Sequence, residues 1–179
     1  MKSSTTGAIF VRSNSRIQEL AQLRGRDIAF ADPISESGYL FPMDLFAAAQ
    51  LIPRGTDPRR FFHRLYFAGG YQQAIQAVAE GFVDAAGVSI YALMLLPPDK
   101  QSKVRSIAIT PPIPSHAVIA RKGFDPALRH SFIEAMLKLN QPEFRHLLKH
   151  VYGPDGYVRA QPADYDRVAD LARAYGLIK

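Results

Sequence analysis

The stretch Asp32-Pro-Ile-Ser-Glu-Ser-Gly-Tyr-Leu-Phe-Pro42 decides how this sequence folds, because it joins two regular elements of different kinds. It follows a short apolar run, Ile28-Ala-Phe-Ala31, that is typical of a buried strand. It precedes residues 43–50, whose composition predicts a helix. A strand, a turn rich in serine and glycine, and a helix start form a recurrent anion site, since free backbone N–H groups and the positive end of the helix dipole converge there.

The turn carries four candidate ligand-binding residues. Ser35 and Ser37 can each donate a hydroxyl, while Gly38 lets a ligand approach the backbone and offers its own N–H. The N–H of Tyr39 is the fourth candidate donor. The alternative is that Ser35 or Ser37 is only the N-cap of the following helix, which is the more common role of serine at a helix start.

The rest of the chain predicts the α/β class, with a mixed sheet flanked by helices. Apolar runs and helical patterns alternate up to residue 121, and amphipathic helical patterns follow. No repeat at solenoid spacing is present. The expected strands cover 7–12, 27–31, 64–68, 82–88, 104–110 and 117–121, and the expected helices cover 16–23, 43–50, 71–79, 90–96, 126–139, 143–151 and 164–175.

A second turn, Gly69–Tyr71, also follows an expected strand and opens an expected helix. Ligands of open α/β sheets bind beyond the carboxyl ends of the strands. If the two strands are neighbours, both turns face one crevice, and this convergence favours an anion pocket over a simple cap. Tyr71 is then a fifth candidate ligand-binding residue; the alternative, an amphipathic residue at the helix start, is about equally favoured.

Composition narrows the function classes. The 179 residues carry 22 Lys and Arg against 16 Asp and Glu, a net charge of +6, which favours anionic partners. The basic residues are scattered and not interleaved with aromatic residues, so we expect no nucleic-acid partner. There is no cysteine, no apolar run long enough to insert in a membrane, and no signal peptide at the start of this sequence.

The sequence predicts no enzyme, no metal and no cofactor. His146 and His150 have the i, i+4 spacing of a metal pair, but the stretch between them lacks an acid, so exposed histidines explain them better. The serines of the turn lack the Gly-x-Ser-x-Gly pattern of a hydrolase nucleophile. Asp84, inside a buried strand pattern, is expected to cap or pair there. No catalytic residue is assigned.

The assembled motifs resemble the periplasmic substrate-binding proteins of phosphonate-, phosphite- and phosphate-type ABC importers, a branch of the type 2 periplasmic binding fold. The similarity extends from about residue 7 to about residue 170. Each motif is weak alone, but their order and spacing are specific. The motifs are Leu23–Pro33, Ser35–Pro42, Phe67–Tyr71, Ala77–Ala86, Pro111–Pro114 with Ala117–Arg121, and Tyr152–Tyr157.

The resemblance implies two lobes that are joined by two crossing strands, near Gly7–Arg12 and His116–Arg121, and that close over one oxyanion. Residues 7–121 would form the complete second lobe, with the anion-site turn. Residues 122–179 would be the C-terminal helices of the first lobe, whose opening part is absent from this N-terminally truncated chain. The implied partners are a small oxyanion and an ABC permease, and the implied location is the periplasm.

Three positions depart from the family pattern. Glu36 replaces a threonine of the family's Ser-Thr-Ser-Gly motif, Tyr71 aligns with a frequent histidine, and Ser89 aligns with an acid. A carboxylate beside an anion costs like-charge repulsion, and a phenol cannot carry a positive charge. The alternative is therefore a degenerate paralogue, or a sensory or protein-interaction module without ligand transport.

The C-terminal helices raise a separate expectation. Their apolar residues, such as Phe132, Met136 and Leu139, lack a visible sheet to cover. We expect these helices to pack on the α/β lobe in a new way or on another copy of the chain.

Overall fold

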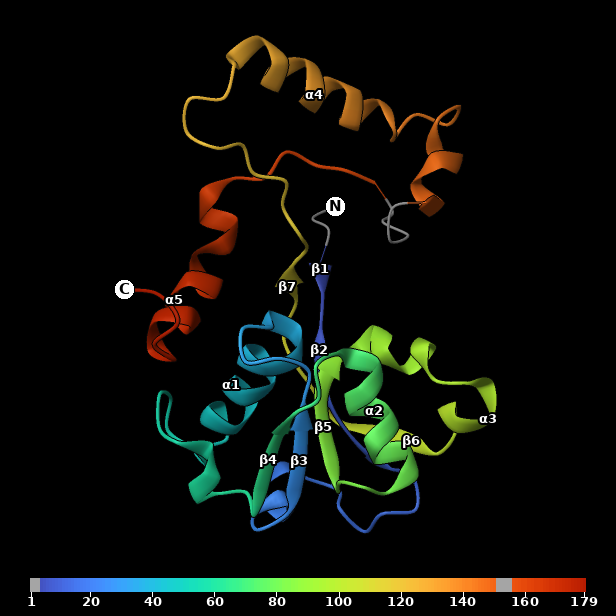
Figure 1. The fold of residues 1–179 in the computed structure, drawn as a ribbon, viewed down its shortest axis with the longest axis vertical. Coiled ribbons are helices and arrows are strands. Elements are labelled where there is room, and N and C mark those ends of the chain that lie inside the picture. Colours follow the sequence, from blue (N-terminus) through green and yellow to red (C-terminus); the bar gives the residue numbers. More distant parts are fainter. Residues whose placement is uncertain (1–3, 151–155) are drawn as a thin grey trace. The chain divides into compact units, whose positions relative to one another are not determined.

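The computed structural model describes residues 4–150 and 156–179, with only the backbone of His150 (Figure 1). The chain divides into two compact units. One, the sheet unit, comprises Thr5–Ile113 and Asp166–Lys179, and the other, the helical unit, is built around Pro114–Tyr165. Part of the motif Tyr152–Tyr157 and the predicted end of a helix at Val151 lie outside the described residues.

The sheet unit contains a five-stranded mixed sheet in the order β4-β3-β5-β2-β6. Strand β3 is parallel to both β4 and β5, whereas β2 is antiparallel to β5 and β6. The predicted α/β class with a mixed sheet is therefore confirmed. The strands are β2 Gly7–Arg12, β3 Asp27–Phe30, β4 Arg64–Phe67, β5 Ala85–Ser89 and β6 Val104–Ile109, and the short strands β1 Ser4–Thr5 and β7 Ile113–Pro114 pair separately.

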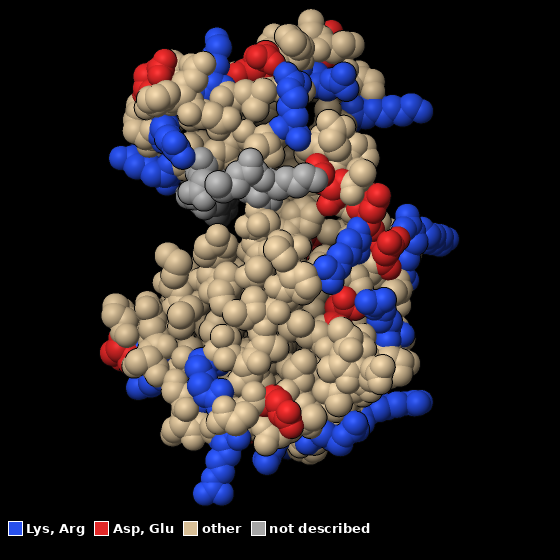
Figure 2. Space-filling view, turned by 180° about the vertical axis from the view of Figure 1, so that it is seen from behind, with Lys and Arg blue, Asp and Glu red and all other residues tan. Residues whose placement is uncertain are grey.

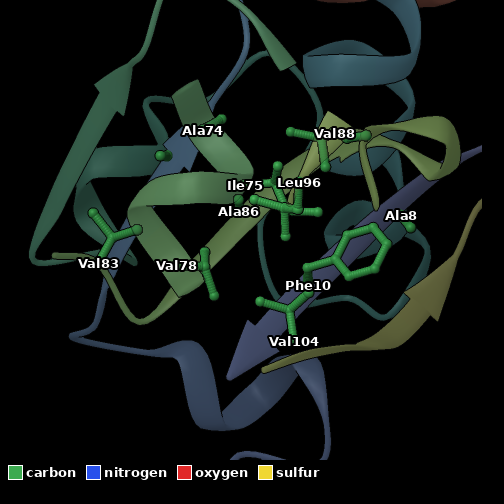
Figure 3. Packing of buried hydrophobic residues seen from close by; sticks show 12 residues of the cluster. Ala8, Phe10, Ala74, Ile75, Val78, Val83, Ala86, Val88, Leu96 and Val104 are labelled. Atoms are coloured by element: carbon green, nitrogen blue, oxygen red, sulfur yellow. The ribbon is translucent and has the colours of Figure 1, made fainter. Parts of the chain in front are cut away.

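Helices cover the sheet on both faces, and the alternation along β2 shows how. Phe10 points to the face covered by α2 (Tyr71–Glu80), where it joins Ile75 and Val78 in one apolar cluster (Figure 3). Its neighbours Ile9 and Val11 point to the other face and pack with residues of α1 (Phe41–Ala48). Successive strand residues face opposite sides, so a sheet covered twice needs this nearly continuous apolar run.

The remaining helices are mostly short. Gly81 ends α2 with a left-handed φ of 83°, as expected for a glycine after a helix. The other α-helices are α3 Pro98–Gln101, α4 Pro126–Lys138 and α5 Asp166–Ala174; 3-10 helices cover Leu20–Leu23, Pro58–Arg60, Ile90–Leu95, Arg145–His150 and Pro162–Tyr165; and a π-helical turn covers Glu36–Leu40.

Three predicted elements are wrong or shorter than expected. Residues 117–121 form no strand: β7 ends at Pro114, and residues 117–121 are exposed. A strand requires a neighbour for its backbone hydrogen bonds, and no strand of the described chain pairs with these residues. The helix predicted over 16–23 is reduced to Leu20–Leu23, since the side-chain amide oxygen of Gln22 accepts the N–H groups that would start a longer helix. The helix predicted over 143–151 is a 3-10 helix, Arg145–His150.

The two units divide the chain differently from the predicted domains 7–121 and 122–179. The helical unit starts at Pro114, and the last helix, α5, belongs to the sheet unit. Leu171 of α5 is buried in a cluster with Leu40, Phe41 and Ile113.

Figure 2 shows charged side chains of both signs interspersed on one face of the sheet unit, without a continuous basic patch.

Candidate functional site

The two predicted turns lie side by side at one edge of the sheet. Strands β3 and β4 are parallel neighbours, with Phe30 opposite Phe67, so their carboxyl ends meet at the same edge. Backbone hydrogen bonds continue past the strands: the N–H of Ala31 donates to the carbonyl of Gly38 at 3.2 Å, and the N–H of Gly69 donates to the carbonyl of Ala31 at 2.9 Å. The predicted adjacency of the two turns is confirmed.

Three hydroxyl groups meet at this edge, and we call Ser35, Ser37 and Tyr71 the hydroxyl triad. The Tyr71 hydroxyl lies 3.1 Å from Ser35 Oγ and 2.9 Å from Ser37 Oγ. Ser35 Oγ also accepts the N–H of Gly38 at 3.1 Å, which makes Ser35 the N-cap of the π-helical turn. Two contacts use two of the three hydroxyl protons, so one proton is left for a partner outside the triad.

Ser35 therefore serves as an N-cap, and this role does not remove its donor. A serine hydroxyl accepts a backbone N–H with one lone pair and keeps its own proton. Ser37, whose side chain is buried, caps no helix, and its hydroxyl hydrogen-bonds only to Tyr71 among the described residues. The arrangement can accept an oxygen atom by hydrogen bonding, and it carries no formal charge.

Gly38 serves the chain's own packing. A Cβ atom at this position would lie 2.7 Å from Cβ of Ala31, 2.8 Å from Ser35 Oγ and 2.9 Å from a ring carbon of Tyr71. Any side chain would push Tyr71 away from the serines. The approach of a ligand to Gly38 stays a prediction; in the structure, the missing side chain leaves room for Tyr71 to complete the triad.

Two further glycines, which sequence reasoning missed, allow the turn to pack closely on the sheet. A Cβ at Gly7 of β2 would lie 2.6 Å from the carbonyl oxygen of Ser37, and a Cβ at Gly87 of β5 would lie against the Phe30 ring and 3.1 Å from Pro42. The available signal was a glycine inside an apolar strand run, which marks a close approach of another segment.

Tyr39 points away from the triad into an aromatic cluster. Its ring centroid lies 5.1 Å from those of Phe30 and Phe67 and 6.1 Å from that of Tyr175, the residue after α5. Burial raises the pKa of the Tyr39 phenol, and the nearby Arg59 opposes this shift. The Tyr39 side chain thus anchors the turn, and only its backbone N–H remains a candidate ligand group.

Other polar residues lie at the same edge. Ser89, at the end of β5, is buried and accepts the N–H of Tyr91. Thr5, the last residue of β1, lies two residues before β2, which starts at this edge because it is antiparallel to β5. Its Oγ1 is the only buried side-chain oxygen or nitrogen without a hydrogen-bond partner in residues 4–149 and 156–179. Such an orphan at a candidate site is a further potential ligand contact, and no sequence motif pointed to it.

Asp84 lies just before β5 and contacts the backbone of the neighbouring strand β3. The Asp84 carboxylate accepts the backbone N–H of Asp27 at 3.1 Å, so the predicted capping role of Asp84 is confirmed. Within the described part of the chain, no three His, Asp or Glu side chains gather closely enough to hold a metal. The same residues contain no helix long and apolar enough to cross a membrane.

Comparison with known proteins shows the family of this chain. Residues 1–165 match the family described as ABC transporter, phosphonate, periplasmic substrate-binding protein. The chain belongs to this family. The resemblance seen in the motifs is therefore confirmed, and with it the type 2 periplasmic binding fold.

Solved structures share the fold at low sequence identity. PhnD1 from Prochlorococcus marinus, in complex with methylphosphonate, matches with a TM-score of 0.80 at 17% identity, over 99% of this chain and 70% of that one. A binding-protein component of an ABC phosphonate transporter from Pseudomonas aeruginosa matches with a TM-score of 0.76 at 20% identity, over 94% and 56%. XAC2383 from Xanthomonas citri, bound to ATP, matches with a TM-score of 0.76 at 24% identity, over 96% and 66%. This chain thus spans between 56% and 70% of the length of these proteins.

Proposed function

We propose that this chain binds a small oxyanion of the phosphonate, phosphite or phosphate class at the hydroxyl triad, as the solute-binding component of an ABC importer. The observation that carries the proposal is the meeting of Ser35, Ser37 and Tyr71 with one hydroxyl proton left over. Family membership supports a solute-binding role, a permease partner and a periplasmic location. Binding requires donors and no reactive group, so the proposed function is not enzymatic.

The ligand would meet neutral donors on this side. The remaining triad proton, the orphan Thr5 hydroxyl and the Tyr39 N–H are the groups that we assign to it. Glu36, in the same turn, would repel an anion, and Tyr71 supplies no positive charge. A site open to water also lacks the desolvation of a closed one, so we expect weak binding by this chain alone.

Thermal unfolding and calorimetry with phosphate, phosphite, methylphosphonate and sulfate test the proposal. A ligand that binds only the folded chain raises its melting temperature by mass action. We expect stabilisation by at least one phosphorus oxyanion and its loss in Ser37→Ala. Ser106→Ala is the matched control, because Ser106 is exposed on β6 at a distance in sequence and sheet order from the triad. Flat responses at millimolar ligand, identical in all three proteins, would contradict the proposal.

A second candidate function is protein contact through the helical unit. Several large apolar side chains of this unit are exposed, including Val118 (72%), Ile119 (88%) and Leu128 (57%). Exposed apolar surface of this kind marks contact sites. Light scattering over a concentration series tests self-association; a monomer at every concentration would contradict contact between copies and leave the permease as the proposed partner.

A further inference from the structure

A cavity open to solvent lies at the end of the sheet opposite the hydroxyl triad, and four of its six lining residues are exposed. Its volume is about 290 Å³. Strand β2 starts opposite Ser89, at the triad edge, and ends at Arg12 in this cavity, so strand geometry places the two sites about 17 Å apart. The lining residues come from the end of β2, the end of α2 and the segment before β6: Arg12, Ser13, Asn14, Ala79, Ser102 and Lys103.

Arg12 supplies the first reason to expect an anion there. Its side chain is half-buried, and its guanidinium lies against Gly81 at the end of α2. Within residues 4–150 and 156–179, no carboxylate and no hydrogen-bond acceptor engages this guanidinium, which offers five N–H donors. The negative end of the α2 dipole favours a cation at this point. The dipole explains why Arg12 is tolerated, but it leaves the N–H donors unmet.

Lys103 adds a second positive charge to the same cavity. The nearby carboxylate of Glu80 is already engaged, because it accepts Lys100 Nζ at 2.7 Å and Gln76 Nε2 at 2.8 Å. The hydrogen bond from Lys100 is the main cause that lowers the pKa of Glu80, and Lys103 contributes less. The cavity therefore keeps an excess of positive charge.

The walls of the cavity are fixed by hydrogen bonds before any ligand binds. The N–H of Ser13 donates to the carbonyl of Lys103 at 2.8 Å, and Ser13 Oγ donates to the carbonyl of Ser102 at 2.7 Å. These bonds tie the end of β2 to the segment before β6. A preformed site loses less conformational entropy on binding. The volume is at the small end for ligand sites, which suits a small ion.

We propose that this cavity, the Arg12 cavity, binds a small phosphate- or sulfate-type oxyanion at a site separate from the hydroxyl triad. The planar guanidinium of Arg12 can bind two oxygen atoms of such an ion at once, and Lys103 supplies a point charge beside it. The phosphate of a lipid headgroup has the same chemistry, and the experiment separates it from the free ion.

Titration of the full 179-residue chain with inorganic phosphate, followed by amide NMR shifts, tests the proposal. We expect shifts at the amides of Ser13, Asn14 and Lys103. Arg12→Gln should weaken this binding about tenfold or more, as expected for the loss of charge-assisted hydrogen bonds. Arg12→Lys should retain part of the binding, because the positive charge remains, although bidentate hydrogen bonding is lost.

Controls separate the Arg12 cavity from the triad and from general charge effects. Arg16→Gln removes the same charge from a nearby exposed residue outside the cavity, and Ser37→Ala alters only the triad; neither should change the shifts. Lys103→Gln gives a second variant if Arg12→Gln does not fold. Absent shifts, or equal weakening by Arg16→Gln, would overturn the proposal. Vesicles of phosphatidylglycerol that bind the chain through Arg12, without any response to free phosphate, would overturn the assignment of a free ion.

Discussion

Helices α2 and α4 both carry apolar residues at helical spacing, yet only α2 is buried. Ala74, Ile75 and Val78 of α2 are completely buried on the sheet, whereas α4 contains no buried residue and its Phe132 is 46% exposed. Helical spacing of apolar residues shows that a helix has a face to cover. It does not show what covers that face, because the partner lies elsewhere in the chain or in another molecule.

Helix α5 shows how specific a partner can be. Leu171 is buried against residues of the triad's turn and α1, and Arg167 lies 3.4 Å from the buried carboxylate of Asp44. The Tyr175 ring contacts Tyr39, so α5 supports the same turn that carries Ser35 and Ser37. The comparison therefore separates α2 and α5, which position the candidate site, from α4, which does not belong to the sheet unit.

The largest predicted effect concerns α2. Ile75→Ala removes a completely buried side chain between α2 and the sheet. We expect a loss of about 3 kcal/mol in the free energy of unfolding, from lost burial and the cavity that remains. Urea denaturation measures it. A loss below about 1 kcal/mol would mean that α2 packs no more tightly than α4, and the comparison would fail.

The second prediction concerns the anchor of α5. The buried Asp44 carboxylate accepts Arg54 Nε at 2.6 Å, in addition to the contact with Arg167. Asp44→Ala removes both charge-assisted interactions, so we expect a loss of about 2 kcal/mol in the free energy of unfolding.

Asp170→Asn is the matched control for Asp44. It removes an exposed pair with Arg173 within α5, and exposed pairs contribute little, so we expect a change of about 0.5 kcal/mol or less. Equal effects of Asp44→Ala and Asp170→Asn in urea denaturation would show that the buried anchor does not hold α5 in place.

Local patterns were sufficient to predict the triad's neighbourhood. The turns Ser35–Gly38 and Gly69–Tyr71 follow apolar strand runs, and they meet because β3 and β4 are parallel neighbours, which was the one condition of the prediction. Periodicity does not encode contacts between distant segments. Such contacts determine the close packing of the turn on Gly7 and Gly87 and the packing of α5 on the sheet unit. The strand expected at 117–121 failed for the same reason, since its apolar pattern came without a neighbour for its backbone.

Among the apolar substitutions, the smaller predicted effect concerns α4. Phe132→Ala removes a side chain that is already 46% exposed, so the chain alone should lose about 1 kcal/mol or less of its free energy of unfolding. Denaturation at several protein concentrations checks this, with Ile75→Ala as the buried reference. A loss as large as that of Ile75→Ala, increasing with protein concentration, would show that a second copy covers α4. In that case α2 and α4 would differ only in whether the covering surface belongs to the same chain.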